Sequence, residues 1–174
     1  TFLPLLRARD IQKHYLNIPD DYFVKYGIHL AEPRNSDLFT GIRILVQRIV
    51  TPTYLKICLT DINILCNSDI ITLKPKAEVT EKELLVIYGI LASRLTMYIL
   101  KSQNVNLDRA TYPKINTTTL QDHPLPDISN VNTRFYSIIR DIINSKKRNP
   151  SFDTSSLESE IDLMVYDLYG LSND

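Results

Sequence analysis

The feature that most restricts the fold of this chain is a change in the spacing of its apolar residues near position 80. In residues 42–49 the apolar positions alternate, which is typical of a β-strand with two distinct faces. In residues 84–100 they recur every three or four positions, which is typical of an amphipathic helix. Strand spacing followed by helix spacing predicts an α+β fold, with a small, mostly antiparallel sheet and a long packed helix.

Local residues set the limits of these elements. Pro52 ends the first strand, and residues 54–60 and 70–73 form the next strands, with Asp, Asn and Ser residues between them that favour turns. The segment Thr80-x-x-Glu83 is a capping box, which satisfies the free N–H groups at the start of a helix. We therefore expect one long helix from Thr80 to about position 100, with its apolar stripe in the core.

The end of the chain predicts a two-helix tail. Apolar residues in the segment 135–143 lie on one face of the first helix, and the basic run 146–148 suits its C-terminal end. The second helix begins at another capping box, Ser155-x-x-Glu158. We therefore divide the chain into a domain of residues 1–128 and a helical tail of residues 129–174, which packs on the domain or on a partner.

Composition excludes several classes of protein. The chain has 174 residues, 44% of them apolar and 23% charged, which is enough to bury a core. No apolar run approaches the roughly 20 residues of a membrane helix, so we expect a cytoplasmic protein without a membrane partner. Cys58 and Cys66 form no CxxC and the four glycines are scattered, which predicts no metal site and no phosphate loop. Because the sequence begins with Thr1 and not with Met, we expect it to be a piece of a longer protein.

The sequence also lacks the motifs of three kinds of active site. The segment Asn149-Pro150-Ser151-Phe152 resembles the turn of amino-methyltransferases, but it lacks the second proline and precedes a helix cap. Pro19-Asp20-Asp21 has no acidic residue two positions before a lysine to complete a metal-nuclease motif. The three histidines lie far apart in the sequence, with no nucleophile assigned to them. We therefore expect no catalytic residue in this chain.

A binding surface is the remaining possibility. The net charge is zero, but residues 1–56 hold eight Lys and Arg against five Asp and Glu. Arg and Gln side chains match guanine and adenine edges in the major groove, and Lys suits phosphates. This charge excess is small, so a solvated sheet edge would account for the same residues. The candidate contacts are Arg7, Arg9, Lys13, Arg43, Gln47 and Arg48.

The order of several short motifs adds a family resemblance. The motifs are LRARDI (6–11), IRILVQRI (42–49), YGILASRLTMY (88–98), YPKI (112–115), HPLP (123–126) and LESEIDLMVYDLYGL (157–171). In this order they resemble the TaqI-like C-terminal specificity domains, which are the target recognition domains of adenine-specific DNA methyltransferases and of fused type IIG restriction–modification enzymes. Ala8 stands where the family usually has Gly, and Gln47 where Arg is common. These departures leave the base preference open.

The resemblance implies a division of tasks. This chain would recognise a sequence in double-stranded DNA, and an upstream methyltransferase domain of the same chain would bind S-adenosylmethionine and, in a fused nuclease, Mg. No cofactor is expected in this segment itself. Lys74 and Lys76 are added as phosphate contacts, and Lys114 as a contact to DNA or to the catalytic domain. Arg7 and Arg9 are equally suited to holding the start of the chain in place.

Two other functions stay open at this point. An enzyme in its own right would bind S-adenosylmethionine or a metal through this segment alone. A protein-interaction or oligomerisation module would use the helical tail, and its DNA retention would not depend on Arg43 or Arg48.

Overall fold

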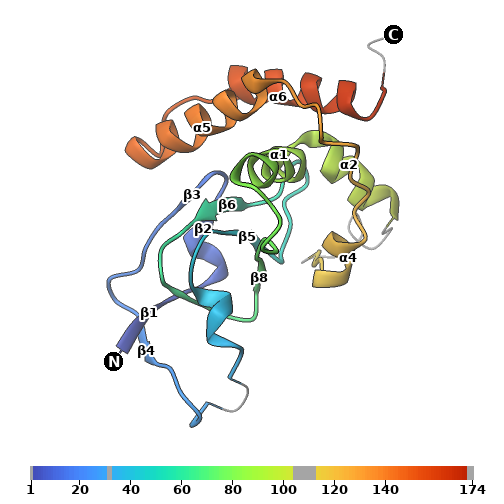
Figure 1. The fold of residues 1–174 in the computed structure, drawn as a ribbon. Helices are drawn as coiled ribbons and strands as arrows, with labels where there is room; N and C mark the ends of the chain where they lie inside the picture. The colour runs from blue at the N-terminus through green and yellow to red at the C-terminus, as the bar shows by residue number, and fades with distance from the viewer. Residues whose placement is uncertain (1, 31–32, 104–112, 172–174) are drawn as a thin grey trace.

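The computed structural model describes residues 2–30, 33–103 and 113–171. At its centre is an antiparallel sheet of three strands in the order β6–β5–β8 (Figure 1). The strands are β5 (Arg43–Gln47), β6 (Ile57–Thr60) and β8 (Ile70–Leu73). All three lie within the segments that show strand spacing or strand composition. The predicted α+β class with a small, mostly antiparallel sheet is confirmed.

The first forty residues, together with the short strand β7, supply a second layer, which the sequence did not resolve into elements. Strand β1 pairs antiparallel with β4 and parallel with β7, while β2 and β3 form a short hairpin. Figure 1 shows β1 and β4 at the end of the molecule away from α5 and α6. Strands of two to five residues show too few alternations to detect. The elements are β1 (Phe2–Leu6), η1 (Ala8–Asp10), β2 (Ile11–Gln12), β3 (Tyr15–Leu16), β4 (Phe23–Lys25), η2 (Ser36–Phe39) and β7 (Leu65–Cys66).

Both faces of the central strand β5 are buried. Ile44 and Val46 belong to a large core that it shares with the helices. Leu45 belongs to a second core, which also contains Leu6 and Ile11 from the N-terminal layer. Because successive side chains of a strand point to opposite faces, the even positions serve one core and the odd positions the other. No face of β5 remains for solvent.

The predicted long helix is in fact two helices. They are α1 (Glu81–Ala92) and α2 (Arg94–Gln103), bent by 63° at Ser93. Ser93 is extended and its hydroxyl donates to the Ile90 carbonyl at 2.7 Å, while Oδ1 of Asp162 accepts from the Arg94 N–H at 2.9 Å. Residue 162 therefore caps the first N–H of the new helix, while the Ser93 hydroxyl accepts from the Thr96 N–H at 3.4 Å. No single described helix is long and apolar enough to cross a bilayer; only this bent pair meets those criteria.

The tail packs on the rest of the chain. Figure 1 shows α5 (Thr133–Arg148) and α6 (Ser155–Leu168) as a layer over α1, with the short α4 (Thr117–Gln121) beside the sheet. Phe135 of α5 is fully buried and lies in one core with the residues of α1. Helix α6 starts after Thr154, whose hydroxyl donates to Glu158 at 2.6 Å. The capping box predicted at Ser155 is therefore wrong: the N-cap residue is Thr154, and the Ser155 N–H donates to Asp153 at 2.9 Å rather than to Glu158.

A buried polar network joins the tail to the hairpin and the sheet. Nδ1 of His14 lies 2.7 Å from the Tyr88 hydroxyl, and Nε2 lies 3.4 Å from the carboxylate of Glu158. Lys13 pairs with the other oxygen of that carboxylate. Burial lowers the pKa of His14 more than Glu158 raises it. Burial also tends to raise the pKa of Glu158, but hydrogen bonds with His14, Lys13 and Thr154 bring it well below its usual range.

Replacement of Gly89 by Ala tests the contact between α1 and α5. A Cβ at position 89 would lie 2.6 Å from Cε1 of Phe135, and the phenyl ring has no free space because it is fully buried. We expect Gly89→Ala to lower the free energy of unfolding by about 2 kcal/mol in urea denaturation. The loss should be smaller in a Phe135→Leu background. An equal loss in both backgrounds would contradict the assigned contact.

The buried imidazole of His14 predicts a loss of stability in mild acid. The unfolded chain binds a proton at His14 near pH 6.5, whereas the folded chain binds it only at lower pH. The free energy of unfolding should therefore fall by about 1 kcal/mol as the pH drops from about 7.5 to about 5.5. In His14→Asn, which suits the positive φ of 73° at this position, the fall should be smaller. The same pH dependence in both proteins would contradict this account.

Candidate nucleic-acid interface

Two predicted contacts, Arg43 and Gln47, lie in the interior. Arg43 has no exposed surface and Gln47 is 9% exposed. Both occupy odd positions of β5, which face the second core rather than solvent. The expectation that they contact DNA is therefore wrong for this structure, because the N-terminal layer covers the face that carries them.

Arg43 has a structural task instead. Its Nη1 donates to the carbonyl of Gly41 at 2.8 Å, and its Nη2 donates to those of Ile62 and Ile64 at 2.8 and 3.2 Å. Burial lowers the pKa of the Arg43 guanidinium. The side chain thus satisfies main-chain carbonyls of the two segments that flank the sheet, and it ties the 61–64 loop to the start of β5.

The basic residues near the start of the chain also take part in structure. Arg7 donates through Nε to Asp10 at 3.1 Å and lies over the ring of Tyr22 at 5.1 Å. The hydrogen bond with Asp10 raises the pKa of Arg7. Lys13 lies over the ring of Tyr54 at 5.2 Å and belongs to the network with Glu158. Arg7 therefore anchors the start of the chain, whereas Arg9 keeps 70% of its side chain exposed.

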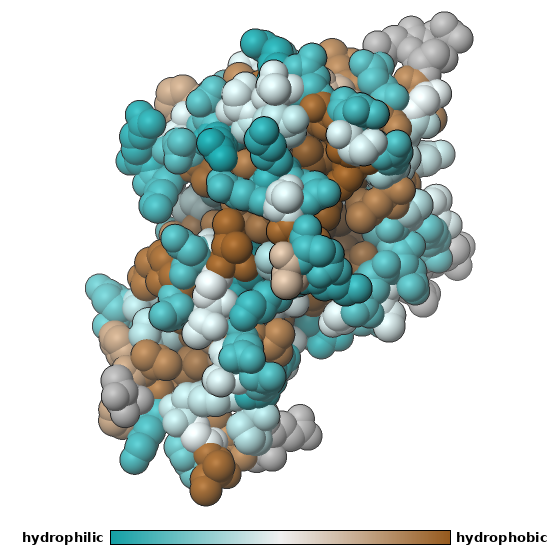
Figure 2. Space-filling model, in the orientation of Figure 1, coloured by the Kyte–Doolittle hydropathy of each residue, from teal (hydrophilic) through white to brown (hydrophobic). Residues whose placement is uncertain are grey.

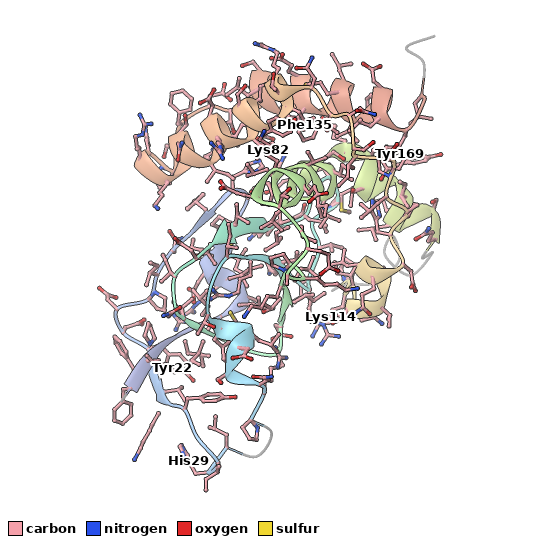
Figure 3. The ribbon with its side chains drawn as sticks, viewed as in Figure 1. Tyr22, His29, Lys82, Lys114, Phe135 and Tyr169 are labelled. Atoms are coloured by element: carbon pink, nitrogen blue, oxygen red, sulfur yellow. The ribbon has the colours of Figure 1, made fainter. Side chains whose placement is uncertain are left out.

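The structure brings together three of the predicted residues, Arg48, Lys74 and Lys114. The segment 113–115 pairs with residues 48–50, since the Ile115 N–H donates to the Arg48 carbonyl at 2.9 Å. This pairing fixes Lys114 beside α4, as Figure 3 shows. Its ammonium lies 3.5 Å from Asp69. Lys74 donates to the carbonyl of Asp37 at 2.7 Å from across the same region.

Of these three residues, Arg48 lines a polar hollow of about 510 Å³ at the free edge of β8. We call it the β8-edge hollow. Arg48 is half-buried in it, with Nε donating to the Ile115 carbonyl at 3.2 Å. Lys74 and Lys114 are exposed and lie two residues from the lining residues Thr72 and Asn116, and Lys76 is exposed farther along the chain. The polar residues that line the hollow are Arg34, Asn35, Arg48, Ser68, Thr72, Asn116 and Thr117.

The hollow presents mainly hydrogen-bond donors. Asn35 and Asn116 each cap a short helix, and each uses its amide oxygen for that cap, at 2.9 Å to the N–H of Asp37 and 3.4 Å to the N–H of Thr119. The amide nitrogens are left to donate to a ligand. Together with the guanidinium groups of Arg34 and Arg48, they suit phosphate oxygens and the acceptor-rich edge of guanine.

Sequence reasoning missed Arg34, Asn35, Asn116 and Thr117. A signal was present, because Asn followed by Ser or Thr is typical of a helix start. What could not be predicted is that two such caps, far apart in the chain, lie against the same strand edge. The face drawn in Figure 2 is mostly hydrophilic, with apolar patches between the α5–α6 layer and the β1–β4 end.

Among the described residues, neither a metal site nor a reactive cysteine is supported. No group of three or more His, Cys, Asp or Glu there is placed to hold a metal ion. Cys58 and Cys66 are free but buried, and burial raises the pKa of Cys66 to about 11. A thiol with so high a pKa carries almost no thiolate at neutral pH. The β8-edge hollow is therefore the best candidate site, and it is a site for binding.

Replacement of Arg43 by Met tests whether this residue stabilises the fold or contacts DNA. The change leaves the carbonyls of Gly41, Ile62 and Ile64 without their donor. We expect Arg43→Met to lower the free energy of unfolding by about 3 kcal/mol. Affinity for duplex DNA should be unchanged at a temperature where the variant is folded. Normal stability with lost DNA binding would mean that Arg43 reaches the duplex itself.

One comparison identifies the family of this chain. The model of the TaqI-like C-terminal specificity domain matches residues 3–125, which is more than half of the chain. The match covers the sheets, α1, α2 and the β8-edge hollow, and it ends before α5. A search of curated proteins finds no match. The chain therefore belongs to the family of TaqI-like C-terminal specificity domains.

Proposed function

We propose that the chain recognises a specific sequence of double-stranded DNA through the β8-edge hollow. Membership of a specificity-domain family places it in the context of restriction–modification enzymes. The observation that carries the proposal is the convergence of Arg34, Arg48, Asn35 and Asn116 on one strand edge. Lys74 and Lys114 at the rim would contact phosphates, and the guanidinium and amide groups would read base edges.

Catalysis would lie in another domain of the parent protein. We propose an adenine-N6 methyltransferase domain upstream, with S-adenosylmethionine as its cofactor, and Mg if the parent also cleaves DNA. That this segment itself holds neither cofactor stays a prediction, which rests on the scattered glycines and the lack of a metal-ligand motif in the sequence. The segment would contribute the choice of sequence, while the upstream domain would act on the base.

The tail favours this proposal over an oligomerisation module. Phe135, Ile138 and Ile139 form the apolar stripe of α5, and all three are buried in one core with α1. The apolar stripe of α5 is therefore already covered by other residues of the same chain. A helix-mediated association would have to use other residues.

The double variant Arg48→Ala/Lys114→Ala tests the proposed interface. Both side chains reach solvent, so their loss should leave the fold intact. We expect duplex affinity to fall about 100-fold and the slope of log K against log salt to become shallower by about 1, because Lys114 is the proposed phosphate contact of the two. Fluorescence anisotropy with a duplex selected from a randomised pool measures both quantities.

A matched control removes two positive charges elsewhere. Lys147→Ala/Arg148→Ala lies at the exposed end of α5, outside the hollow. It should change duplex affinity less than about threefold, because long-range charge effects are screened by salt. Equal losses in both double variants, or selection without any sequence preference, would rule out the β8-edge hollow as the recognition site.

A further inference from the structure

The free edge of β8 leaves one residue with both of its main-chain polar groups unpaired. The Arg48 N–H donates to the Asp69 carbonyl at 2.9 Å, so every second residue from Asp69 onward forms hydrogen bonds with β5. The main-chain groups of Ile70 and Thr72 therefore point away from β5. The Ile70 N–H donates to the Asn67 carbonyl at 3.2 Å. In the described part of the chain, neither the N–H nor the C=O of Thr72 has a hydrogen-bond partner.

These unpaired groups lie in the wall of the β8-edge hollow. Thr72 is half-buried and lines the hollow, whereas its hydroxyl oxygen is buried. The polar groups that Thr72 offers to a ligand are therefore the N–H and C=O of its main chain. The guanidinium and amide groups around them are donors, so the carbonyl of Thr72 adds an acceptor directly beside a donor.

Two lysines lie near the two ends of this edge. The ammonium of Lys114 lies 3.5 Å from Asp69, which directly precedes β8, and Lys74 directly follows the strand. From Asp69 to Lys74 a strand extends about 16 Å, and the major groove of B-DNA is about 12 Å wide. Phosphates bound at the two lysines would therefore leave base edges opposite the middle of β8, where Thr72 lies.

We propose that the main chain of Thr72 reads an adenine in the duplex; this role rests on the proposed function and adds a base preference to it. The N–H and C=O of one residue in a strand point to the same side. The major-groove edge of adenine places an acceptor, N7, next to a donor, the N6 amino group. The Thr72 N–H would donate to N7, and its C=O would accept from the amino group. Guanine is disfavoured there, because its O6 would face the carbonyl as a second acceptor.

Replacement of Thr72 by proline removes the proposed donor. The pairing with β5 does not use this N–H, and proline is tolerated at such a position of an edge strand. We expect Thr72→Pro to weaken binding of the selected duplex about tenfold in fluorescence anisotropy. Thr72→Val keeps both main-chain groups and replaces a buried hydroxyl, so it should bind as the unchanged chain does.

A matched control places a proline at the opposite edge of the sheet. The Gln47 N–H donates to the Lys56 carbonyl at 2.9 Å, so Leu59 on β6 also points its main-chain groups outward. Leu59 does not line the β8-edge hollow. Leu59→Pro should change duplex affinity less than about threefold, measured at a temperature where urea denaturation shows the variant to be folded.

A change in the DNA tests the same contact from the other side. In 7-deazaadenine a C–H group replaces N7, while the N6 amino group is kept. Placed at each adenine of the selected site in turn, it should weaken binding of the unchanged chain about tenfold at one position. At that position it should cause no further loss in Thr72→Pro, because the donor is already absent. If Thr72→Pro does not fold, the series with the unchanged chain still decides, since a site without a sensitive adenine overturns the proposal.

The outcomes separate this role of Thr72 from duplex recognition itself. A chain that selects no sequence, or that binds normally as Arg48→Ala/Lys114→Ala, contradicts the proposed function and, with it, the role of Thr72. A selected sequence that Thr72→Pro binds normally contradicts the role of Thr72 alone. So does a loss in Thr72→Pro that simply adds to the loss caused by 7-deazaadenine at every adenine.

Discussion

The burial of β5 on both faces is the constraint on which the rest of the structure depends. A central strand between two cores needs a layer on each side, and these layers are the helices and the short N-terminal strands. The face that carries the odd positions of β5 is not filled by apolar side chains alone, because Arg43 and Gln47 are buried there. The buried charge of Arg43 is stabilised because its guanidinium donates to three main-chain carbonyls. These hydrogen bonds also connect the loops on either side of the sheet.

The sequence predicted those elements that carry enough periods of their pattern. Strand β8 matches its predicted segment, and α5 contains the whole apolar stripe from Phe135 to Ile143. The bend at Ser93 could not be predicted in full, because the Ser93 hydroxyl supplies only part of the cap of α2 and the rest comes from Asp162 on the tail. The apolar stripe continues through the bend, so spacing alone cannot reveal a change in helix direction.

The candidate site was predicted only in part, and the reason is the same constraint. An alternating strand predicts that one set of positions faces solvent, which made Arg43 and Gln47 attractive candidates. In the structure the N-terminal layer buries those positions, and its strands are too short to be predicted from residue spacing. Arg48 and Lys114 lie just beyond the covered part of β5, so their side chains still reach the surface.

A neutral chain offers a cationic surface only where its basic side chains are not already paired with carboxylates. Glu158, Asp162 and Asp10 each pair with a basic side chain that supports the fold. At the β8-edge hollow, however, Asp69 lies against Lys114. A phosphate that binds Lys114 must compete with that carboxylate, so charge alone gives little gain there. Hydrogen bonds from the guanidinium and amide groups to base edges must supply the difference, which favours a specific sequence over any other stretch of duplex.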